Sequence, residues 1–241
     1  SSINTMTDKL KEYEQQIVRS SQLATAGKIT TAMAHEIRNP LSSIKMMTQV
    51  LKARLSDKPE ENHITQSLYQ EIIRLERIVR DLTDLAKPSE LFFSYCDMNE
   101  VLKEVFPVIE PKMLHRKIHL IKELQNPLPL VKTDKDRLKQ VIWNLLLNAM
   151  ESMPAGGAIK ISSCLKEAPQ RIEVIIEDEG HGIDEETLQK VFTPFFTTKP
   201  EGLGLGLSTS KEIVERHGGR LTVQKRGGKG VRTIVSLPVT S

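Results

Sequence analysis

The first third of the chain places apolar residues at alternating steps of three and four positions. The first segment shows this spacing at Ile3, Met6, Leu10, Tyr13 and Ile17. It is the spacing of a coiled-coil seam. The pattern resumes at Ile37, Leu41, Ile44 and Leu51 and stops at residues 56–62, where Pro59 and polar neighbours indicate a turn. A second helix is predicted from Ile64 to Leu82 and ends before Pro88.

The two predicted helices form a hairpin in which each helix has one apolar face. A single hairpin is too small to bury both faces, and pairing with a second copy would give a four-helix bundle. The alternative is a bundle packed within one chain against the remaining residues. We expect residues 1–88 to form a dimerisation module.

From about Leu91 the pattern changes, because helical stretches alternate with short β-rich runs. We predict strands over 118–124, 158–165, 171–178, 220–226 and 231–239, and helices over 98–115, 134–152, 184–191 and 207–217. Several strands follow one another directly, and GGKG at 227–230 is a hairpin signal. These runs predict a mixed α+β sheet layered with helices in a second domain, residues 89–241.

Composition narrows the function classes. The net charge of +3 comes from 34 basic and 31 acidic residues without a long block of one sign, which argues against nucleic acid as a partner. Cys96 and Cys164 show no pairing or zinc-site spacing, which fits a reducing cytosol. No apolar run reaches the roughly 18–20 residues of a membrane helix. Because a helical pattern is already under way at Ser1, we expect the cytoplasmic portion of a membrane-anchored protein.

The stretch GLGLGLS at 202–208 places Gly202, Gly204 and Gly206 directly before a helical pattern. Glycines allow backbone N–H groups to approach a phosphate, and a helix N-terminus adds partial positive charge. The stretch therefore predicts a phosphate-binding turn, with a flexible connector as the alternative. The preceding TPFFTTKP at 193–200 supplies Phe195 and Phe196, which we expect to pin a flap, and Lys199, which we expect to reach a phosphate.

The stretch DEGHGI at 178–183 follows a predicted strand. Asp178 at the strand end can accept a hydrogen bond from a ligand's amino group, and Gly180 and Gly182 let a ring pack near the backbone. An ordinary Asp-Gly turn is the alternative. On the helix QVIWNLLLNAMES, residues 140–152, Asn144 and Asn148 share a face. Side-chain carbonyls together with phosphate oxygens suit Mg²⁺.

In order and spacing these stretches resemble the ATP-binding domain of sensor histidine kinases, a superfamily shared with type II topoisomerases, mismatch-repair ATPases and heat-shock chaperone ATPases. AHEIRNPLSSIK at 34–45 is similar to the family's histidine box. The resemblance implies an α/β sandwich with a short ATP lid, Thr197 to Leu203, and it extends to the sporulation kinases of Gram-positive spore formers. It also implies roles for site residues: adenine recognition by Asp178, Mg²⁺ binding by Asn148 with Asn144 close by, and phosphate contacts from Lys199 and the backbone of Gly202–Gly206.

His35 lies outside the apolar seam of its helix and should face water. A neutral imidazole is a competent nucleophile toward a phosphoryl group, provided that the other ring nitrogen can lose its proton. Glu36 is the candidate general base, as the resemblance also implies. Asn39 lies one turn beyond His35, and the resemblance implies that its amide orients the water that dephosphorylates a response regulator. Pro40 should bend the helix there.

We therefore expect a homodimeric, ATP- and Mg²⁺-dependent histidine autokinase that phosphorylates His35. The phosphoryl group would pass to an aspartate of a response regulator receiver domain, and a protein inhibitor could dock on the outer face of the bundle. The rival enzyme is a conformational clamp ATPase of the same superfamily, whose glutamate early in the asparagine box is replaced here by Asn144. A third alternative, a binding module with a degenerate site, would lack glycines or asparagines that this chain retains.

Overall fold

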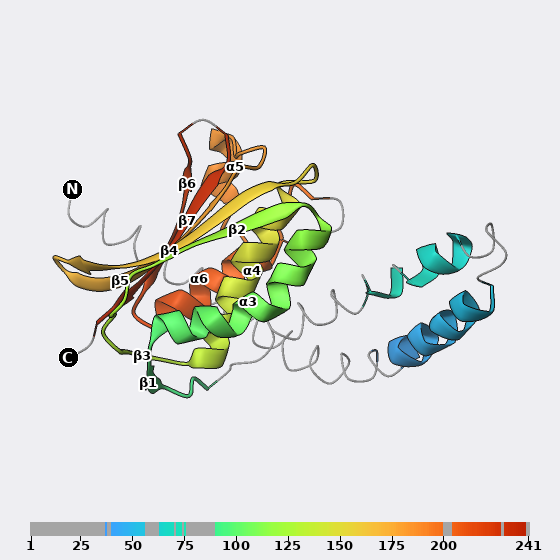
Figure 1. Ribbon diagram of the computed structural model, residues 1–241, viewed down its shortest axis with the longest axis horizontal. Coiled ribbons are helices and arrows are strands. Elements are labelled where there is room, and N and C mark those ends of the chain that lie inside the picture. The colour runs from blue at the N-terminus through green and yellow to red at the C-terminus, as the bar shows by residue number, and fades with distance from the viewer. Residues whose placement is uncertain are drawn as a thin grey trace, which may run out of the picture. The chain divides into compact units, whose positions relative to one another are not determined.

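The chain forms two compact units, Ser1–Ser89 and Glu90–Ser241, in the computed structural model (Figure 1). The structure describes residues 37, 40–55, 63–69, 71–73, 75, 90–199, 204–227 and 229–239. Several sequence predictions lie outside these residues, namely those for the seam at 3–17, the turn at 56–62, His35, Glu36, Asn39 and Gly202. Each unit is described by itself.

The first unit is helical wherever it is described apart from the turn at Leu55. Residues 40–54 form one helical stretch, and helical residues recur between 63 and 75. Leu41 and Ile72 are buried, whereas many apolar side chains are exposed in the single chain, among them Ile44, Val50, Leu51, Ile64 and Leu68. This unit therefore keeps an apolar surface that its own described residues do not cover.

The second unit is built on a five-stranded sheet in the order β2-β4-β5-β7-β6. The strands are β2 (Ile118–Leu124), β4 (Gly157–Glu167), β5 (Gln170–Asp178), β6 (Arg220–Lys225) and β7 (Val231–Pro238). β2 runs parallel to β4, and every other neighbouring pair is antiparallel. The predicted mixed sheet is thereby confirmed, including the hairpin that joins β6 to β7.

Three helices pack against one face of this sheet, namely α3 (Met98–His115), α4 (Lys135–Glu151) and α6 (Gly206–Arg216) (Figure 1). The short helix α5 (Glu185–Lys190) follows β5. The core between helices and sheet contains fully buried Leu102, Ile142 and Leu146 from the helices, and Ile159 and Ile161 from β4. The α/β sandwich of the fold prediction is therefore what the chain forms.

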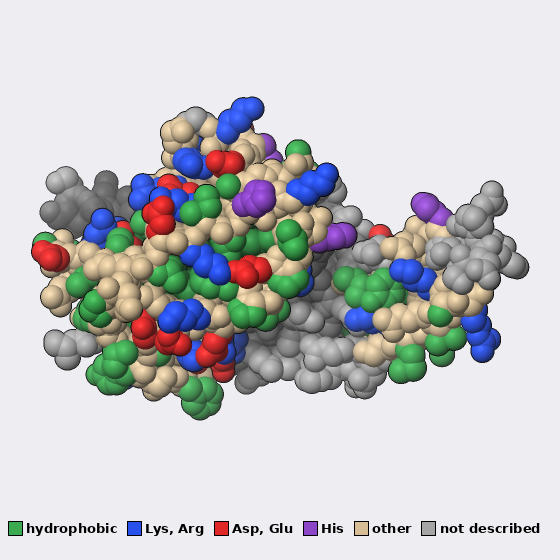
Figure 2. All heavy atoms as spheres, viewed as in Figure 1, with side chains coloured by type: hydrophobic (Ala, Val, Ile, Leu, Met, Phe, Trp, Pro, Cys, Tyr) green, Lys and Arg blue, Asp and Glu red, His purple; other side chains and the backbone are tan. Residues whose placement is uncertain are grey.

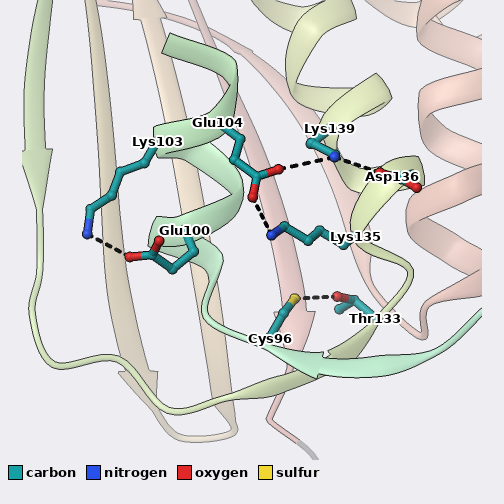
Figure 3. A network of polar contacts seen from close by, with 8 residues as sticks. All are labelled: Cys96, Glu100, Lys103, Glu104, Thr133, Lys135, Asp136 and Lys139. Carbon is teal, nitrogen blue, oxygen red and sulfur yellow. Dashed lines mark hydrogen bonds and ion pairs between the residues drawn. The ribbon is translucent and has the colours of Figure 1, made fainter. Parts of the chain in front are cut away.

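A second, two-stranded sheet joins β1 (Ser94–Cys96) to β3 (Val131–Thr133) in antiparallel register. Cys96 Sγ lies 3.0 Å from Thr133 Oγ1 across this pair (Figure 3). These strands were not predicted from the sequence. With three residues each, they are too short to show the two-residue alternation by which a strand is recognised.

Each of the two long helices starts at an aspartate. Asp97 caps α3 by accepting from Asn99 N–H at 2.8 Å, and Asp134 caps α4 by accepting from Arg137 N–H at 3.1 Å. Side-chain oxygens at this position satisfy N–H groups that have no acceptor within the helix. The Asp134 cap fixes where α4 begins and therefore which of its residues lie on each face of the helix.

Ion pairs link α3 to α4 near these starts (Figure 3). Glu104 on α3 accepts from Lys135 and, at 3.2 Å, from Lys139, both on α4. These hydrogen bonds lower the pKa of Glu104.

Basic and acidic side chains are interspersed over the visible face of the second unit (Figure 2), as the balanced composition suggests. Within the described parts of the chain, no helix has the length and apolar character to cross a membrane.

Candidate functional site

One face of α4 carries the polar residues of the candidate site. Asn144, Asn148 and Glu151 follow one another at steps of four and three, so they lie on the same side of the helix. The opposite side is buried through Leu145, Leu146 and Ala149. Two predicted site residues are therefore placed side by side by the helix, and Glu151, which the sequence did not single out, joins them.

Lys199 contacts this face of α4. Its Nζ donates to Asn148 Oδ1 at 2.9 Å and to Glu151 Oε2 at 2.5 Å. Lys199 was expected to reach a phosphate and Asn148 a divalent cation, and the structure brings these two residues together. The Lys199 ammonium therefore bridges an amide oxygen and a carboxylate oxygen of one helix face. The amide and carboxylate oxygens are ligands that Mg²⁺ accepts.

Asn144 lies beside the start of α6. Its Nδ2 is 3.5 Å from the carbonyl oxygen of Gly206, the first residue of that helix. The side-chain hydrogen bond that often caps a helix start is lacking at Leu205 in this described part of the chain. Because N–H groups of a first turn have no acceptor within the helix, the α6 N-terminus can donate to an anion. This N-terminus lies next to the polar face of α4, which contacts the Lys199 ammonium.

Asp178 ends β5 and is only 5% exposed. Its Oδ1 accepts from Gly180 N–H at 2.8 Å and contacts Ser152 Oγ at 3.1 Å. Burial raises the pKa of Asp178, although hydrogen bonds from Gly180, Ser152 and Val231 oppose the shift. A carboxylate has about four acceptor positions, so Asp178 can also accept from a ligand's amino group.

The glycines after Asp178 are required by close contacts and by backbone shape. A Cβ at Gly180 would lie 2.1 Å from Ser152 Oγ and 2.8 Å from Asp178 Oδ1. Gly182 has φ +82°, a conformation that other residues rarely adopt. Ser152 follows the last residue of α4, and its carbonyl also accepts from His181 N–H at 3.3 Å. The Asp178 carboxylate thus contacts the C-terminal end of the helix that carries Asn144 and Asn148.

The base of the expected lid is closed by backbone contacts. Phe195 N–H donates to the Gly204 carbonyl at 3.1 Å, and a Cβ at Gly204 would lie 2.3 Å from the Phe196 carbonyl oxygen. Both Phe195 and Gly204 have positive φ, +66° and +68°. Of the two rings expected to pin the flap, Phe195 is 57% exposed and does not pack against the domain, whereas Phe196 is half-buried. Main-chain contacts close the base of the lid instead.

Sequence reasoning missed Glu151 and Ser152. Glu151 carried a usable signal, because it continues the spacing of Asn144 and Asn148 on one helix face. Ser152 carried none, because its partner Asp178 is 26 residues away. Among the described residues, no group of three His, Cys, Asp or Glu side chains could hold a metal ion by itself.

The site combines a buried acceptor for an amino group, a cation-binding face and a helix N-terminus suited to an anion. This combination fits a nucleoside triphosphate accompanied by a divalent cation. Its elements come from α4, the end of β5 and the start of α6. Of the predicted residues, the structure assembles Asn144, Asn148, Lys199 and Gly206 on one side and Asp178 with Gly180 on the other.

Comparisons with known proteins agree with this arrangement. Residues 25–91 match the His Kinase A phospho-acceptor domain, and residues 133–241 match the histidine kinase-, DNA gyrase B- and HSP90-like ATPase family. Sensor histidine kinase ZraS of Escherichia coli O157:H7 is 36% identical over 94% of this chain and 49% of its own length. Sporulation kinase C of Bacillus subtilis strain 168 is 33% identical over 97% of this chain and 54% of its own length.

A solved structure covers nearly the whole chain. The histidine kinase ThkA, crystallised in complex with the response regulator protein TrrA, is 33% identical, with a TM-score of 0.68 over 96% of this chain and 67% of its own. This chain spans about half the length of the curated relatives it matches. The two matched domains in this order, with these relatives, show that the chain belongs to the sensor histidine kinases.

Proposed function

We propose that this protein is an ATP- and Mg²⁺-dependent histidine autokinase that phosphorylates its own His35. The observation that carries the proposal is the arrangement around α4, which links the buried carboxylate of Asp178 through Ser152 to the cation-binding pair Asn148 and Glu151. A nucleotide with a divalent cation needs an acceptor for the adenine amino group and oxygen ligands for the cation, placed along one site. Residues 89–241 would be the catalytic domain, and residues 1–88 the dimerisation and phosphotransfer domain.

In this proposal Asp178 accepts from the adenine amino group, while Gly180 and Gly182 leave room for the ring. The phosphates lie against the N-terminus of α6 and the backbone of Gly202–Gly206, where Lys199 adds a positive charge. Asn148 is the protein ligand of Mg²⁺, and Asn144 lies close by. Bound Mg²⁺ would neutralise charge on the phosphate oxygens.

The acceptor step uses residues outside the described part of the chain. A ring nitrogen of His35 attacks the γ-phosphorus, the bond between that phosphorus and the bridging oxygen breaks, and ADP leaves. Glu36 accepts the proton of the other ring nitrogen as positive charge develops on the imidazole. The phosphoryl group then passes to an aspartate on a response regulator, and Asn39 orients water for the reverse, phosphatase activity.

The assembly we propose is a homodimer. The exposed apolar side chains of the first unit, including Ile44, Leu51 and Leu68, support it, because a four-helix bundle would cover them. The ThkA–TrrA complex supports a response regulator as the second partner. A protein inhibitor on the outer face of the bundle, and a membrane-anchored sensing region with this part in the cytoplasm, belong to the same proposal for the whole protein.

The amount of ADP formed separates an autokinase from a clamp ATPase. With excess ATP and Mg²⁺, an autokinase forms ADP only until its histidines are phosphorylated, so the wild-type protein should give a burst that levels off. His35→Gln should remove that burst, and Asn148→Ala should remove it by weakening Mg²⁺ binding. Continuous ADP formation that persists in His35→Gln would instead identify an ATPase.

A further inference from the structure

The turn between β6 and β7 presses against the end of β5. Gly230, in this turn, is buried and has φ +102°. A Cβ at Gly230 would lie 1.9 Å from the carbonyl oxygen of Asp178 and 3.2 Å from Cα of Glu179. Neither atom belongs to a side chain that could rotate away. Any residue other than glycine would have to move the turn or the backbone of Asp178.

Arg226 holds the same carbonyl from the other end of the turn. Its Nη1 donates to Asp178 O at 3.2 Å and lies 3.9 Å from Glu179 Oε1. The Arg226 N–H also donates to the Gly230 carbonyl at 3.3 Å, which closes the turn on itself. The guanidinium and the glycine therefore act on one main-chain group.

The turn also reaches the carboxylate and the glycine that follows it. The Val231 backbone donates a hydrogen bond to Asp178. A Cβ at Gly182 would lie 3.5 Å from Gly230 N, so the two glycines face each other. Together with Ser152, directly after α4, and the N–H of Gly180, three separate parts of the chain fix the direction of the Asp178 carboxylate.

We propose that Arg226 and Gly230 are positioning residues that aim Asp178 and so set the preference for a purine with a 6-amino group. They act through the main chain of Asp178 and do not themselves touch the ligand. A hydrogen bond to a ligand depends on placement within about 0.5 Å, and a displaced Asp178 backbone would exceed that tolerance. The inference rests on the proposed function, in which Asp178 recognises adenine.

The test compares two nucleotides that differ only at the group that Asp178 contacts. Equilibrium binding is measured for ATP and for the triphosphate of purine riboside, which carries hydrogen in place of the 6-amino group, both with Mg²⁺. The ratio of the two dissociation constants isolates the amino contact. For the wild-type protein we expect a preference for ATP of about 10- to 100-fold, the range for a hydrogen bond to a charged group.

Two variants and two matched controls use the same turn. Gly230→Ala and Arg226→Met should each lower the ATP preference by about threefold or more. Gly227→Ala is the glycine control, because a Cβ at Gly227 meets nothing within 4 Å. Lys225→Met is the cation control, because Lys225 is the neighbour of Arg226 but pairs with Glu185 at 2.9 Å. Both controls should keep the wild-type ratio.

The outcomes distinguish this inference from the proposed function. A variant that only loosens the fold weakens the binding of both nucleotides equally and leaves the ratio of dissociation constants unchanged. An unchanged ratio in Gly230→Ala and Arg226→Met would overturn the positioning role alone. A wild-type protein that binds both nucleotides equally would overturn the assignment of Asp178 and the inference with it. Lowered ratios in a protein that fails to phosphorylate His35 would support the inference while removing the autokinase.

Discussion

Lys199 and Asn148, one expected at the phosphates and the other at the metal, are hydrogen bonded to each other at 2.9 Å. Glu151 holds the same ammonium at 2.5 Å. In the proposed function Lys199 contacts a phosphate, which then competes with these two oxygens for the ammonium group. Glu151 opposes this exchange of partners.

Glu151→Gln should strengthen binding of ATP in the absence of Mg²⁺, because it weakens the hold on Lys199 and removes a negative charge near the phosphates. The Lys199–Glu151 pair is about one-third exposed on each side, so we expect a change of only about two- to fivefold. Titration of ATP in the presence of a chelator measures it. Glu186→Gln, which removes a similar pair with Lys190 on α5, should have no effect, and equal or weaker binding by Glu151→Gln would refute the exchange.

The stability of Asp178→Asn relative to the wild-type protein should rise with pH, while ATP binding weakens. Because burial raises the pKa of Asp178, the folded state favours the protonated carboxyl. The protonated carboxyl therefore contributes to the stability of the fold. This contribution is present in full below the usual pKa of 3.8 and is lost as pH rises through the higher pKa of the folded state. The asparagine stays neutral, so its advantage should grow across this window and then level off.

Chemical denaturation of the wild-type protein and Asp178→Asn at a series of pH values measures this difference. Asp184→Asn is the control for the sign, since hydrogen bonds from Thr187 lower the pKa of Asp184. Its variant should instead lose stability relative to the wild-type protein as pH rises. A pH-independent difference for Asp178→Asn would show that the carboxylate is not destabilised by burial.

Gly204→Ala should disturb the base of the lid. Its positive φ disfavours a side chain, and the 2.3 Å approach of the Phe196 carbonyl oxygen leaves no room for one. We expect a cost of about 1–3 kcal/mol in the free energy of unfolding. Gly206→Ala is the matched control, because a Cβ there meets Asn144 at an ordinary 3.8 Å. Equal stability of the two variants would contradict the tight contact.

His217→Phe should destabilise the second unit, Glu90–Ser241, without changing a residue of the candidate site. His217 is buried and accepts from Asp134 N–H at 2.9 Å through Nε2, while Nδ1 lies 2.7 Å from the Ile213 carbonyl. Phenylalanine leaves the Asp134 N–H without this acceptor, at a cost of about 1–3 kcal/mol, whereas the Ile213 carbonyl keeps the backbone N–H of residue 217. Denaturant unfolding tests this, with exposed His119→Phe expected to change little. A small loss in His217→Phe would show that water replaces the imidazole.

Elements with a long regular pattern could be predicted from the sequence. The helix at 98–115 and the strand at 118–124 have the predicted bounds, because each shows its period over enough residues to be recognised. The strands β1 and β3 could not be predicted. Their pairing joins Cys96 to Val131, and no local pattern records a contact so distant in sequence.

The candidate site also combines features that a local pattern predicts with contacts between residues distant in sequence. Asn144 and Asn148 could be placed on one face because a helix has a fixed repeat, and Asp178 could be placed at a strand end. The contacts of Asp178 with Ser152 and Arg226 could not be predicted, because the partners are 26 and 48 residues apart in the sequence. Helix and strand periodicity thus predict which residues line the site, whereas tertiary packing determines which of them touch.

In the proposed function this chain phosphorylates its own His35 with its own nucleotide site. The most direct measurement is incubation with γ-labelled ATP and Mg²⁺, beside His35→Gln and Asn148→Ala, followed by acid and alkali treatment of the labelled protein. We predict a label that is lost in acid, is stable in alkali and is absent from both variants. Normal labelling of His35→Gln, or turnover of ATP without any labelled protein, would contradict the account.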